Sequence, residues 1–464
     1  RQRQMCIRDR NDSKATRWGA LVIVAFTMMA AYYVNDVVAP LKTMLETDLA
    51  WSSTDFGFFT GGYSFLNVFF LMLIWGGLIL DRFGIRFTGK LATILMVGGT
   101  ALEYYAMTGL AGADATLFGI NEIFGYKTGV FVAFAGYSIF GVGAEVAGIT
   151  VSKIIAKWFK GKELATAMGV QVALARIGSQ AGYAVAIPLA RAFGISTPVL
   201  LGLVLLLGGM IAFFVFAVMD KKLDKQMEAA AIAAGTEDEE EKFSFKDVKN
   251  ILVNPGFWLI ALLCVLFYSC VFPFQKFASE LMIIKYGINE NVAGTFAGLP
   301  ALGALILTPV FGGFIDKRGK SASIMLLGSA MLICVHFIYA IPDINYWLVA
   351  IVLMIILGIA FSLVPSAMWP AVAKIFPVSQ LGTAYALIFF IQNIGLWGIP
   401  TLIGWVLDAY CISGKKPDGT NMYDYTVPMC IFTGIACLSL IVALLLKKAD
   451  KKYGYKLEEP NIQK

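Results

Sequence analysis

Long apolar runs, each of about 20 residues, recur from one end of the chain to the other. An α-helix rises about 1.5 Å per residue, so each run can cross a hydrocarbon core of about 30 Å. Only 15% of the 464 residues are charged, against about 25% in a typical soluble domain. The chain is therefore predicted to be an all-α membrane protein with twelve transmembrane helices. The predicted spans are residues 18–40, 56–80, 88–110, 128–157, 163–190, 196–219, 256–284, 292–315, 321–341, 346–374, 381–408 and 427–447.

The basic residues lie in the short connections on one side of these spans. Arg86, Lys157 and Lys317 follow the second, fourth and eighth spans, whereas the connection at 341–345 on the other side has no Lys or Arg. Basic connections usually face the cytoplasm, so we expect both termini to be cytoplasmic and the protein to lie in the cell (inner) membrane. This topology accounts for the formal net charge of +6, and we expect no nucleic-acid partner.

A charged, Ala-rich segment at 220–254 separates two halves that repeat each other. The phrase GKELATAMGVQVALARIG (161–178) aligns with VSQLGTAYALIFFIQNIG (378–395) at a shift of 217 residues. Parallel repeats of this kind form one transporter architecture, with a substrate site at the midplane between the halves. The predicted parts are an N-terminal cytoplasmic tail (1–16), an N-terminal six-helix half (17–219), a cytoplasmic linker (220–254), a C-terminal six-helix half (255–447) and a C-terminal cytoplasmic tail (448–464). Residues 1–10 resemble translated sequencing-adapter read-through and are expected to be non-native.

Two short phrases share the order Asp, basic residue, any residue, Gly: GLILDRFGIR (77–86) and GGFIDKRGK (312–320). They resemble the signature that the major facilitator superfamily carries after its second and eighth helices, which implies the twelve-helix fold of that superfamily. An Asp at such a helix end can meet basic residues and the positive N-terminus of a neighbouring helix, so we predict a conformational latch. The alternative is a solvated charged loop that serves orientation only. The predicted latch residues are Asp81, Arg82, Arg86, Asp316, Lys317 and Lys320.

Glu145 and Arg176 are predicted to lie deep in the membrane. They are 13 and 14 residues from the ends of the basic turn at 158–162, which places both about 20 Å from that turn. A charge at the bilayer centre costs about 2.5 to 3.5 kcal/mol, so each side chain should face the protein interior and find a partner or a ligand there. The repeat puts Ser362 and Asn393 at the matching positions of the second half, so the charged pair is present in one half only.

A one-sided pair favours an asymmetric ligand that carries both signs of charge. Glu145 would capture an amine, and Arg176 would hold a carboxylate with two parallel hydrogen bonds. A zwitterion fits this description. The alternative is a structural ion pair between Glu145 and Arg176 that serves packing.

A closer resemblance includes the same pair. The run WFKGKELATAMGVQVALARIGS (158–179), with GVGAE before it, and the phrases FKDVK (245–249), VFPF (271–274), AMWP (367–370) and LGTAY (381–385) look like the superfamily branch that contains the lysosomal dipeptide uniporter. The resemblance implies a dipeptide carrier in which Glu145 and Arg176 engage the peptide termini. No acidic dileucine signal precedes Trp18, and the one Asn-x-Ser sequon begins at Asn11 on the cytoplasmic side, so we expect a plasma membrane carrier of bacterial origin.

Further candidates lie in other spans. Asp36 is expected either to meet the substrate or a proton, or to act as an outer gate residue. Lys276 and Glu280 are four residues apart and are expected to neutralise each other. Glu103 and His336 are unpaired in the sequence; His336 is interpreted as a packing residue, and Glu103 is expected near the outer surface. The predicted substrate-binding set is completed by Tyr32, Tyr268, Trp369 and Asn393, with the aromatic residues as walls for variable side chains.

The function predicted from the sequence is transport of a dipeptide by alternating access, as a uniporter or coupled to protons. One alternative is a proton-coupled carrier of an organic anion or a sugar, and another is a non-transporting membrane sensor. We expect no enzymatic activity, cofactor or metal site, because no metal constellation or catalytic triad is visible. The expected partners are the small-molecule substrate and the lipid bilayer, with the chain a monomer and an accessory subunit as an alternative. Cys411 and Cys430 flank the last outer loop and are expected to be free thiols, with a disulfide as the alternative.

Overall fold

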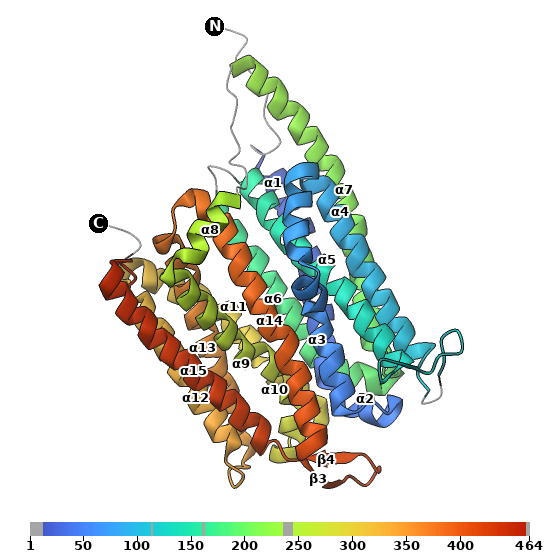
Figure 1. The fold of residues 1–464 in the computed structure, drawn as a ribbon. Coiled ribbons are helices and arrows are strands. Elements are labelled where there is room, and N and C mark those ends of the chain that lie inside the picture. Colours follow the sequence, from blue (N-terminus) through green and yellow to red (C-terminus); the bar gives the residue numbers. More distant parts are fainter. Residues whose placement is uncertain (1–12, 113–114, 160–162, 235–244, 461–464) are drawn as a thin grey trace.

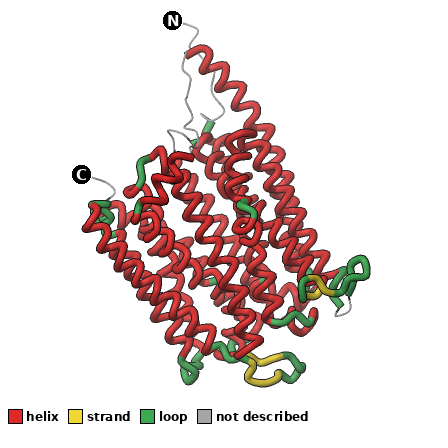
Figure 2. The backbone as a smooth tube through the Cα atoms, viewed as in Figure 1, coloured by secondary structure: helices red, strands yellow, loops and turns green. Residues whose placement is uncertain are grey.

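The structure is a computed structural model that describes residues 13–112, 115–159, 163–234 and 245–460. Helices make up nearly all of it, and the few strands form two short antiparallel hairpins (Figure 2). The N-terminal half contains α1 (Lys14–Val37), the 3₁₀ helix η1 (Ala39–Leu41), α2 (Lys42–Leu49), α3 (Ser53–Phe69), α4 (Met72–Thr108), β1 (Glu122–Ile123), β2 (Tyr126–Lys127), α5 (Thr128–Trp158), α6 (Leu164–Phe193) and α7 (Thr197–Ala234). After α8 (Phe245–Val253), the C-terminal half contains α9 (Pro255–Tyr286), α10 (Glu290–Ala297), α11 (Leu299–Arg318), α12 (Ser321–Ala340), α13 (Trp347–Ile375), α14 (Val378–Tyr410), β3 (Ile412–Lys415), β4 (Asn421–Tyr423) and α15 (Thr426–Tyr453).

Within the described residues, the helices form the twelve crossings predicted from the sequence. Among the described residues, nine helical segments are long and apolar enough to cross a membrane, with α1 to α2 and α10 to α11 each counted as one. The first arm of α4 continues α3 across a 58° bend at Leu71, and Gly84 (φ 73°, ψ 175°) separates that arm from the second arm. Three further crossings are α3 together with the first arm of α4, the second arm of α4, and α6. Added to the nine segments, they make twelve. The predicted sixth span ends at residue 219, whereas α7 continues to Ala234.

The two halves lie side by side (Figure 1). We call the end of the bundle where α1 begins and α15 finishes the terminal end, and the end that carries β3 and β4 the hairpin end. Local sequence explains where key helices start at each end. At the hairpin end, Ser52 and Asp55 form a reciprocal capping box before α3. At the terminal end, the Asn254 side chain accepts a hydrogen bond from the Gly256 N–H as α9 begins.

Glycines bring the helices of the N-terminal half into close contact. A Cβ atom on Gly141 of α5 would lie 2.0 Å from the carbonyl oxygen of Tyr63 on α3. A Cβ atom on Gly178 of α6 would lie 2.1 Å from the carbonyl oxygen of Met29 on α1. Both distances are too short for any side chain, so α5 and α6 are held against α3 and α1 at backbone contact.

Contacts between the halves concentrate at the hairpin end. A Cβ atom on Gly57 of α3 would lie 2.4 Å from the Pro400 carbonyl oxygen on α14. The Asp408 carboxylate of α14 accepts hydrogen bonds from the backbone N–H groups of Ser53 (3.3 Å) and Thr54 (2.6 Å) at the start of α3. Because a helix N-terminus is electropositive, these bonds stabilise the approach of the two halves. The halves are therefore closed against each other at this end.

Candidate functional site

A cavity of about 1050 Å³ lies between the two halves. Its deep end is lined by Asn35, Thr60 and Lys276, and the opposite end by Asp81 and Val248. The Asp81 side chain is 59% exposed and Val248 belongs to α8, so the cavity opens at the terminal end. Together with the closed hairpin end, this describes a transporter-like bundle open on one side.

Glu145 of α5 lines this cavity, where its Oε1 atom accepts a hydrogen bond of 3.0 Å from the Tyr63 hydroxyl. The Tyr63 ring in turn packs against the Tyr137 ring, with centroids 5.8 Å apart. The hydroxyl can donate only one hydrogen bond, so the other Glu145 lone pairs are available to a ligand amine.

Arg176 of α6 lines the same cavity and lies between two aromatic rings. Its guanidinium carbon is 4.8 Å from the centroid of Phe361 on α13 and 5.6 Å from that of Tyr32 on α1. Stacking on ring faces positions the planar guanidinium and leaves its N–H donors free. Among the described residues no ion pair joins Arg176 to Glu145, so the alternative interpretation of a structural ion pair is wrong for this conformation.

Aromatic side chains of the C-terminal half form the facing wall. Tyr268 and Trp369 line the cavity with ring centroids 6.5 Å apart, and the Trp369 ring stacks on Phe389 at 4.8 Å. The Tyr385 hydroxyl donates to the Trp369 carbonyl oxygen at 3.0 Å, which fixes the backbone of α13 at this point. The structure thus brings Tyr32, Tyr268 and Trp369 into the same cavity as the charged pair.

Asp36 and Asn393 lie outside the cavity lining. Asp36 is 7% exposed and accepts hydrogen bonds from Ser179 (2.6 Å), Asn35 (2.9 Å) and Lys276 (3.2 Å). Because Lys276 belongs to the other half, Asp36 bridges the halves just beyond the deep end of the cavity. Asn393 is 1% exposed and donates a hydrogen bond to the Phe389 carbonyl oxygen at 2.9 Å. In this conformation, Asn393 is therefore not positioned to contact a substrate in the cavity.

Lys276 and Glu280 do not neutralise each other, and that prediction is wrong. Lys276 is paired with Asp36, while Glu280 is paired with Lys42 of α2 at 2.5 Å. The four-residue spacing does place both side chains on one side of α9, but each finds a partner across the boundary between the halves. A spacing of four residues along one helix indicates pairs within that helix and not partners on other helices.

Four charged residues, Lys42, Glu46, Glu280 and Lys416, meet at the hairpin end, and we call them the gate cluster; the first three are buried, and the Lys416 side chain is 14% exposed. One ion pair lies within the N-terminal half, Lys42 with Glu46 (2.7 Å), and one lies within the C-terminal half, Lys416 with Glu280 (3.7 Å). Two pairs cross between halves: Lys42 with Glu280 (2.5 Å) and Lys416 with Glu46 (3.6 Å). The Tyr425 hydroxyl also donates to Glu280.

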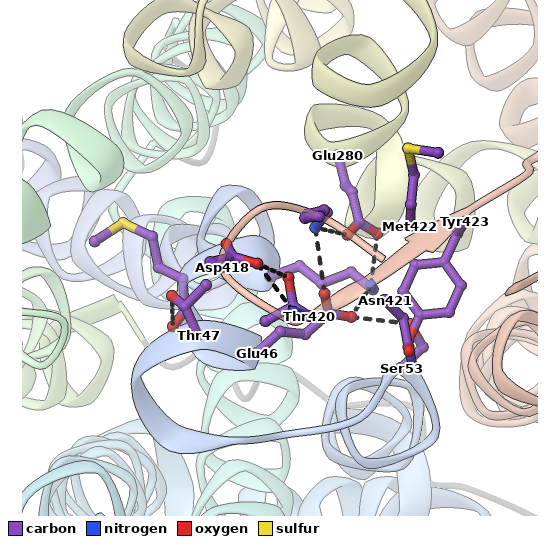
Figure 3. Close-up of polar contacts among 12 residues, drawn as sticks. Glu46, Thr47, Ser53, Glu280, Asp418, Thr420, Asn421, Met422 and Tyr423 are labelled. Atoms are coloured by element: carbon purple, nitrogen blue, oxygen red, sulfur yellow. Dashed lines mark hydrogen bonds and ion pairs between the residues drawn. The ribbon is translucent and has the colours of Figure 1, made fainter. Parts of the chain in front are cut away.

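The gate cluster is covered by the β3–β4 hairpin. Figure 3 shows Glu46 and Glu280 approaching the same point from different halves, with Asn421 and Tyr423 of β4 beside them. The Tyr423 ring lies 4.7 Å from the Lys42 ammonium, and its hydroxyl donates to Asp408 at 2.7 Å. This cluster was not predicted from the sequence, although the four-residue spacing of Lys42 and Glu46 indicates a pair on one helix.

The predicted latch residues lie at the terminal end. Asp81 pairs with Lys153 (3.1 Å), and Arg86 pairs with Asp220 (3.3 Å). The guanidinium of Arg82 lies over the Phe83 ring at 5.5 Å. In the second phrase, Asp316 and Lys317 belong to the last turn of α11, and Lys320 (φ 65°) donates its backbone N–H to the Glu458 carbonyl oxygen at 3.1 Å.

Asp220 is a structural residue that the sequence reasoning assigned to the linker. Its side chain is fully buried, and it accepts hydrogen bonds from Lys157 (2.9 Å) and the Trp158 indole N–H (2.9 Å). These contacts tie α7 to the end of α5. His336 is also buried, with its Nε2 atom 3.0 Å from the Cys270 carbonyl oxygen, and packs as predicted. Cys411 and Cys430 are free thiols, as predicted.

A twelve-helix bundle of two repeated halves, with a central cavity open at one end, defines a membrane transporter that works between the halves. The chain matches the family model of the Major Facilitator Superfamily over residues 21–400 and 277–459, and it belongs to that superfamily. It is similar to the lysosomal dipeptide transporter MFSD1 of Homo sapiens, with 29% identity over 454 residues that cover 95% of this chain and 88% of the relative.

Solved structures show the same fold. The nucleoside transporter NupG is similar with a TM-score of 0.68 and 12% identity, covering 92% of this chain and 98% of that one. The D-xylose-proton symporter has a TM-score of 0.66 and 16% identity, covering 92% and 97%. At these identities the likeness concerns the fold alone.

Proposed function

We propose that this chain carries dipeptides across the membrane by alternating access. The observation that supports the proposal best is that Glu145 and Arg176 line one cavity without pairing with each other. Two unpaired charges of opposite sign suit a ligand that offers both an ammonium and a carboxylate group. The similarity to the lysosomal dipeptide transporter MFSD1 over 95% of the chain favours a dipeptide among such zwitterions.

In this proposal Glu145 binds the peptide ammonium group and Arg176 binds its carboxylate. The guanidinium, positioned between the rings of Tyr32 and Phe361, can present two parallel N–H groups to the carboxylate oxygens. Tyr268 and Trp369 then face the substrate side chains, where apolar rings tolerate variable shapes. Recognition of the peptide ends by charge and of its side chains by rings would give a carrier of broad specificity.

We further propose that the terminal end faces the cytoplasm and that the chain works as a monomer in the cell membrane. Basic residues such as Arg82, Arg86, Lys157 and Lys317 gather near the terminal end, which supports this orientation. The structure then corresponds to the inward-open conformation, with the gate cluster closing the outer side.

A ligand-stabilisation screen of the purified protein tests the proposal. Dipeptides should raise the unfolding temperature, whereas N-acetylated dipeptides, which lack the ammonium group, should have little effect. Equal stabilisation by free and acetylated dipeptides would remove the role of Glu145. The matched variants are Arg176→Asn, expected to abolish binding, and Asn393→Ala, expected to retain it because Asn393 lies outside the cavity lining.

The same variants separate the alternative functions. A carrier of an organic anion or a sugar would depend on Arg176 but retain its ligand in Glu145→Gln. A dipeptide carrier would lose its ligand in both variants. A non-transporting sensor would bind dipeptides without moving them, so radiolabelled dipeptide that stays outside proteoliposomes would favour the sensor.

A further inference from the structure

The connection between α4 and α5 contains two copies of the same unusual turn. Residues 115–127, which we call the aromatic loop, include the phrases LFGI (117–120) and IFGY (123–126). In each phrase the outer two residues pair across a tight turn, Leu117 with Ile120 and Ile123 with Tyr126. The central Phe-Gly residues have positive φ angles: 53° and 79° at Phe118 and Gly119, and 53° and 81° at Phe124 and Gly125.

A phenylalanine is an unfavourable residue at the first central position of such a turn. Positive φ at both central residues normally selects Asn-Gly or Asp-Gly, because a larger side chain pays a steric penalty of about 1 to 2 kcal/mol in the left-handed region. The protein covers little of either Phe side chain, since Phe118 is 96% exposed and Phe124 is 88% exposed. Each turn thus combines a strained backbone conformation with an aromatic ring that points away from the protein.

The position of the aromatic loop indicates what covers these rings. Helix α5 begins at Thr128 and has 31 residues, about 46 Å, so its start lies beyond a hydrocarbon core of about 30 Å and near the headgroups. Figure 1 shows the loop extending sideways from the bundle at the lower helix ends, and not beneath them. A loop that projects sideways at this level meets lipid.

The base of the aromatic loop is fixed to the helices while its tips are free. The Tyr126 ring stacks on Phe58 of α3 at 3.9 Å, and the Phe124 ring lies 5.9 Å from Phe131 of α5. The Lys127 ammonium donates to the Ala50 carbonyl oxygen at the end of α2. These contacts hold the second Phe-Gly turn, and hydrogen bonds from Thr128 to the Ile120 and Asn121 carbonyl oxygens hold the end of the first.

We infer that the aromatic loop is a membrane-surface anchor whose Phe118 and Phe124 rings, with Ile120 (50% exposed), insert at the boundary between headgroups and acyl chains. Aromatic and aliphatic side chains are favoured at this boundary, and their transfer from water offsets the strain of the turns. The ligand of this surface is therefore the lipid bilayer itself. The inference does not depend on which solute the cavity accepts.

Tryptophan substitutions in nanodiscs test the anchor. Phe118→Trp and Phe124→Trp are compared with the parent protein, and the emission of the added Trp is obtained by difference in ordinary lipid and in lipid brominated near the headgroup. We expect the brominated lipid to quench most of the added emission and aqueous iodide to quench little of it. Asn121→Trp is the matched control in the same loop, since Asn121 is an exposed polar residue between the two turns and its added Trp should be quenched by iodide.

A different result would overturn the inference. If the Trp added at position 118 or 124 is quenched by iodide as strongly as the one added at 121, the rings lie in water. A second pair of variants, Phe118→Asn and Phe124→Asn, guards against misfolding, because Asn relieves the strain of the turn. These variants should unfold at the same temperature as the parent, or a higher one, in detergent, and added lipid should stabilise them less than the parent. If the variants instead change the protein from a dimer to a monomer, a second copy of the chain, and not lipid, covers the rings.

Discussion

Substituting Glu280 by Gln is expected to shift the protein from the conformation open at the terminal end towards one open at the hairpin end. In the closed gate cluster, Glu280 neutralises Lys42 at 2.5 Å and contributes to the pairing of Lys416 at 3.7 Å. The Gln side chain keeps the shape of Glu280 and can still accept the hydrogen bond from Tyr425, so the change removes mainly the charge.

The expected size of the shift follows from the arrangement of the four charges. Removing one partner of a buried ion pair costs about 3 to 5 kcal/mol, and the closed gate cluster is buried, with Lys42 and Glu280 side chains each 1% exposed. In the open state the pair of Lys42 and Glu46 stays intact on α2, and Lys416 becomes hydrated, so the loss there is about 0 to 1 kcal/mol. The difference is about 2 to 5 kcal/mol, which corresponds to roughly 30-fold to several-thousandfold in the equilibrium.

Distance measurements between two spin labels read out this equilibrium. Cysteines placed at the exposed positions Asp48 and Ser413, with native cysteines replaced, report the separation of the halves at the hairpin end. The matched control is Glu290→Gln, because Glu290 also pairs across the halves, with Arg191, but is 40% exposed. We expect longer distances in the Glu280→Gln variant only. Equal distance distributions in the two variants would refute the reasoning that burial makes the gate cluster decisive.

Three further outcomes are expected. Glu103 is fully buried, and neither of its carboxylate oxygens has a hydrogen-bond partner among the described residues, so the side chain should already be neutral. Glu103→Gln should therefore change the free energy of unfolding by no more than about 0.5 kcal/mol, as measured by thermal unfolding. A large loss of stability would show that Glu103 is charged. Gly57→Ala should weaken closure at the hairpin end by about 1 to 3 kcal/mol, because the new Cβ would lie 2.4 Å from the Pro400 carbonyl oxygen; unchanged label distances would contradict this. Arg176→Lys should lower dipeptide affinity by about 1.5 to 3 kcal/mol in calorimetric titration, because the positive charge remains but the planar pair of donors is lost; unchanged affinity would argue against a two-bond contact.

The sequence was sufficient to predict the number of membrane crossings and the fold. Helix number follows from the lengths of apolar segments, and those lengths are local properties of the chain. The paired phrases at 161–178 and 378–395 added the repeat of two halves. The limits of individual helices were less predictable, because α3 and α4 bend at Leu71 and reverse at Gly84, where the backbone conformation and not the hydrophobicity changes.

The sequence predicts one height for Glu145 and Arg176, and the structure has both lining one cavity, whereas the contacts of each side chain were not predictable. Counting residues from a basic turn gives the height of Glu145 and Arg176, but the direction of each side chain depends on the rotation of its helix. That rotation is set by contacts such as Gly141 against Tyr63 and Gly178 against Met29, which join segments far apart in the sequence. The gate cluster was harder still, since Lys416 reaches Glu46 from a hairpin about 370 residues later in the chain.

The charged pair and most of the aromatic residues of the cavity come from different halves, which explains how a bound peptide would favour closure. Glu145 and Arg176 both belong to the N-terminal half, whereas Tyr268 and Trp369 belong to the C-terminal half. The free energy needed to place a charged side chain in an open, hydrated cavity is far smaller than in lipid. The empty state can therefore keep Glu145 and Arg176 apart. Arg176 already lies against Phe361 of the C-terminal half, so a peptide bound to Arg176 lies beside that half, and burial of its apolar side chains against Tyr268 and Trp369 would favour the closed state over the open one.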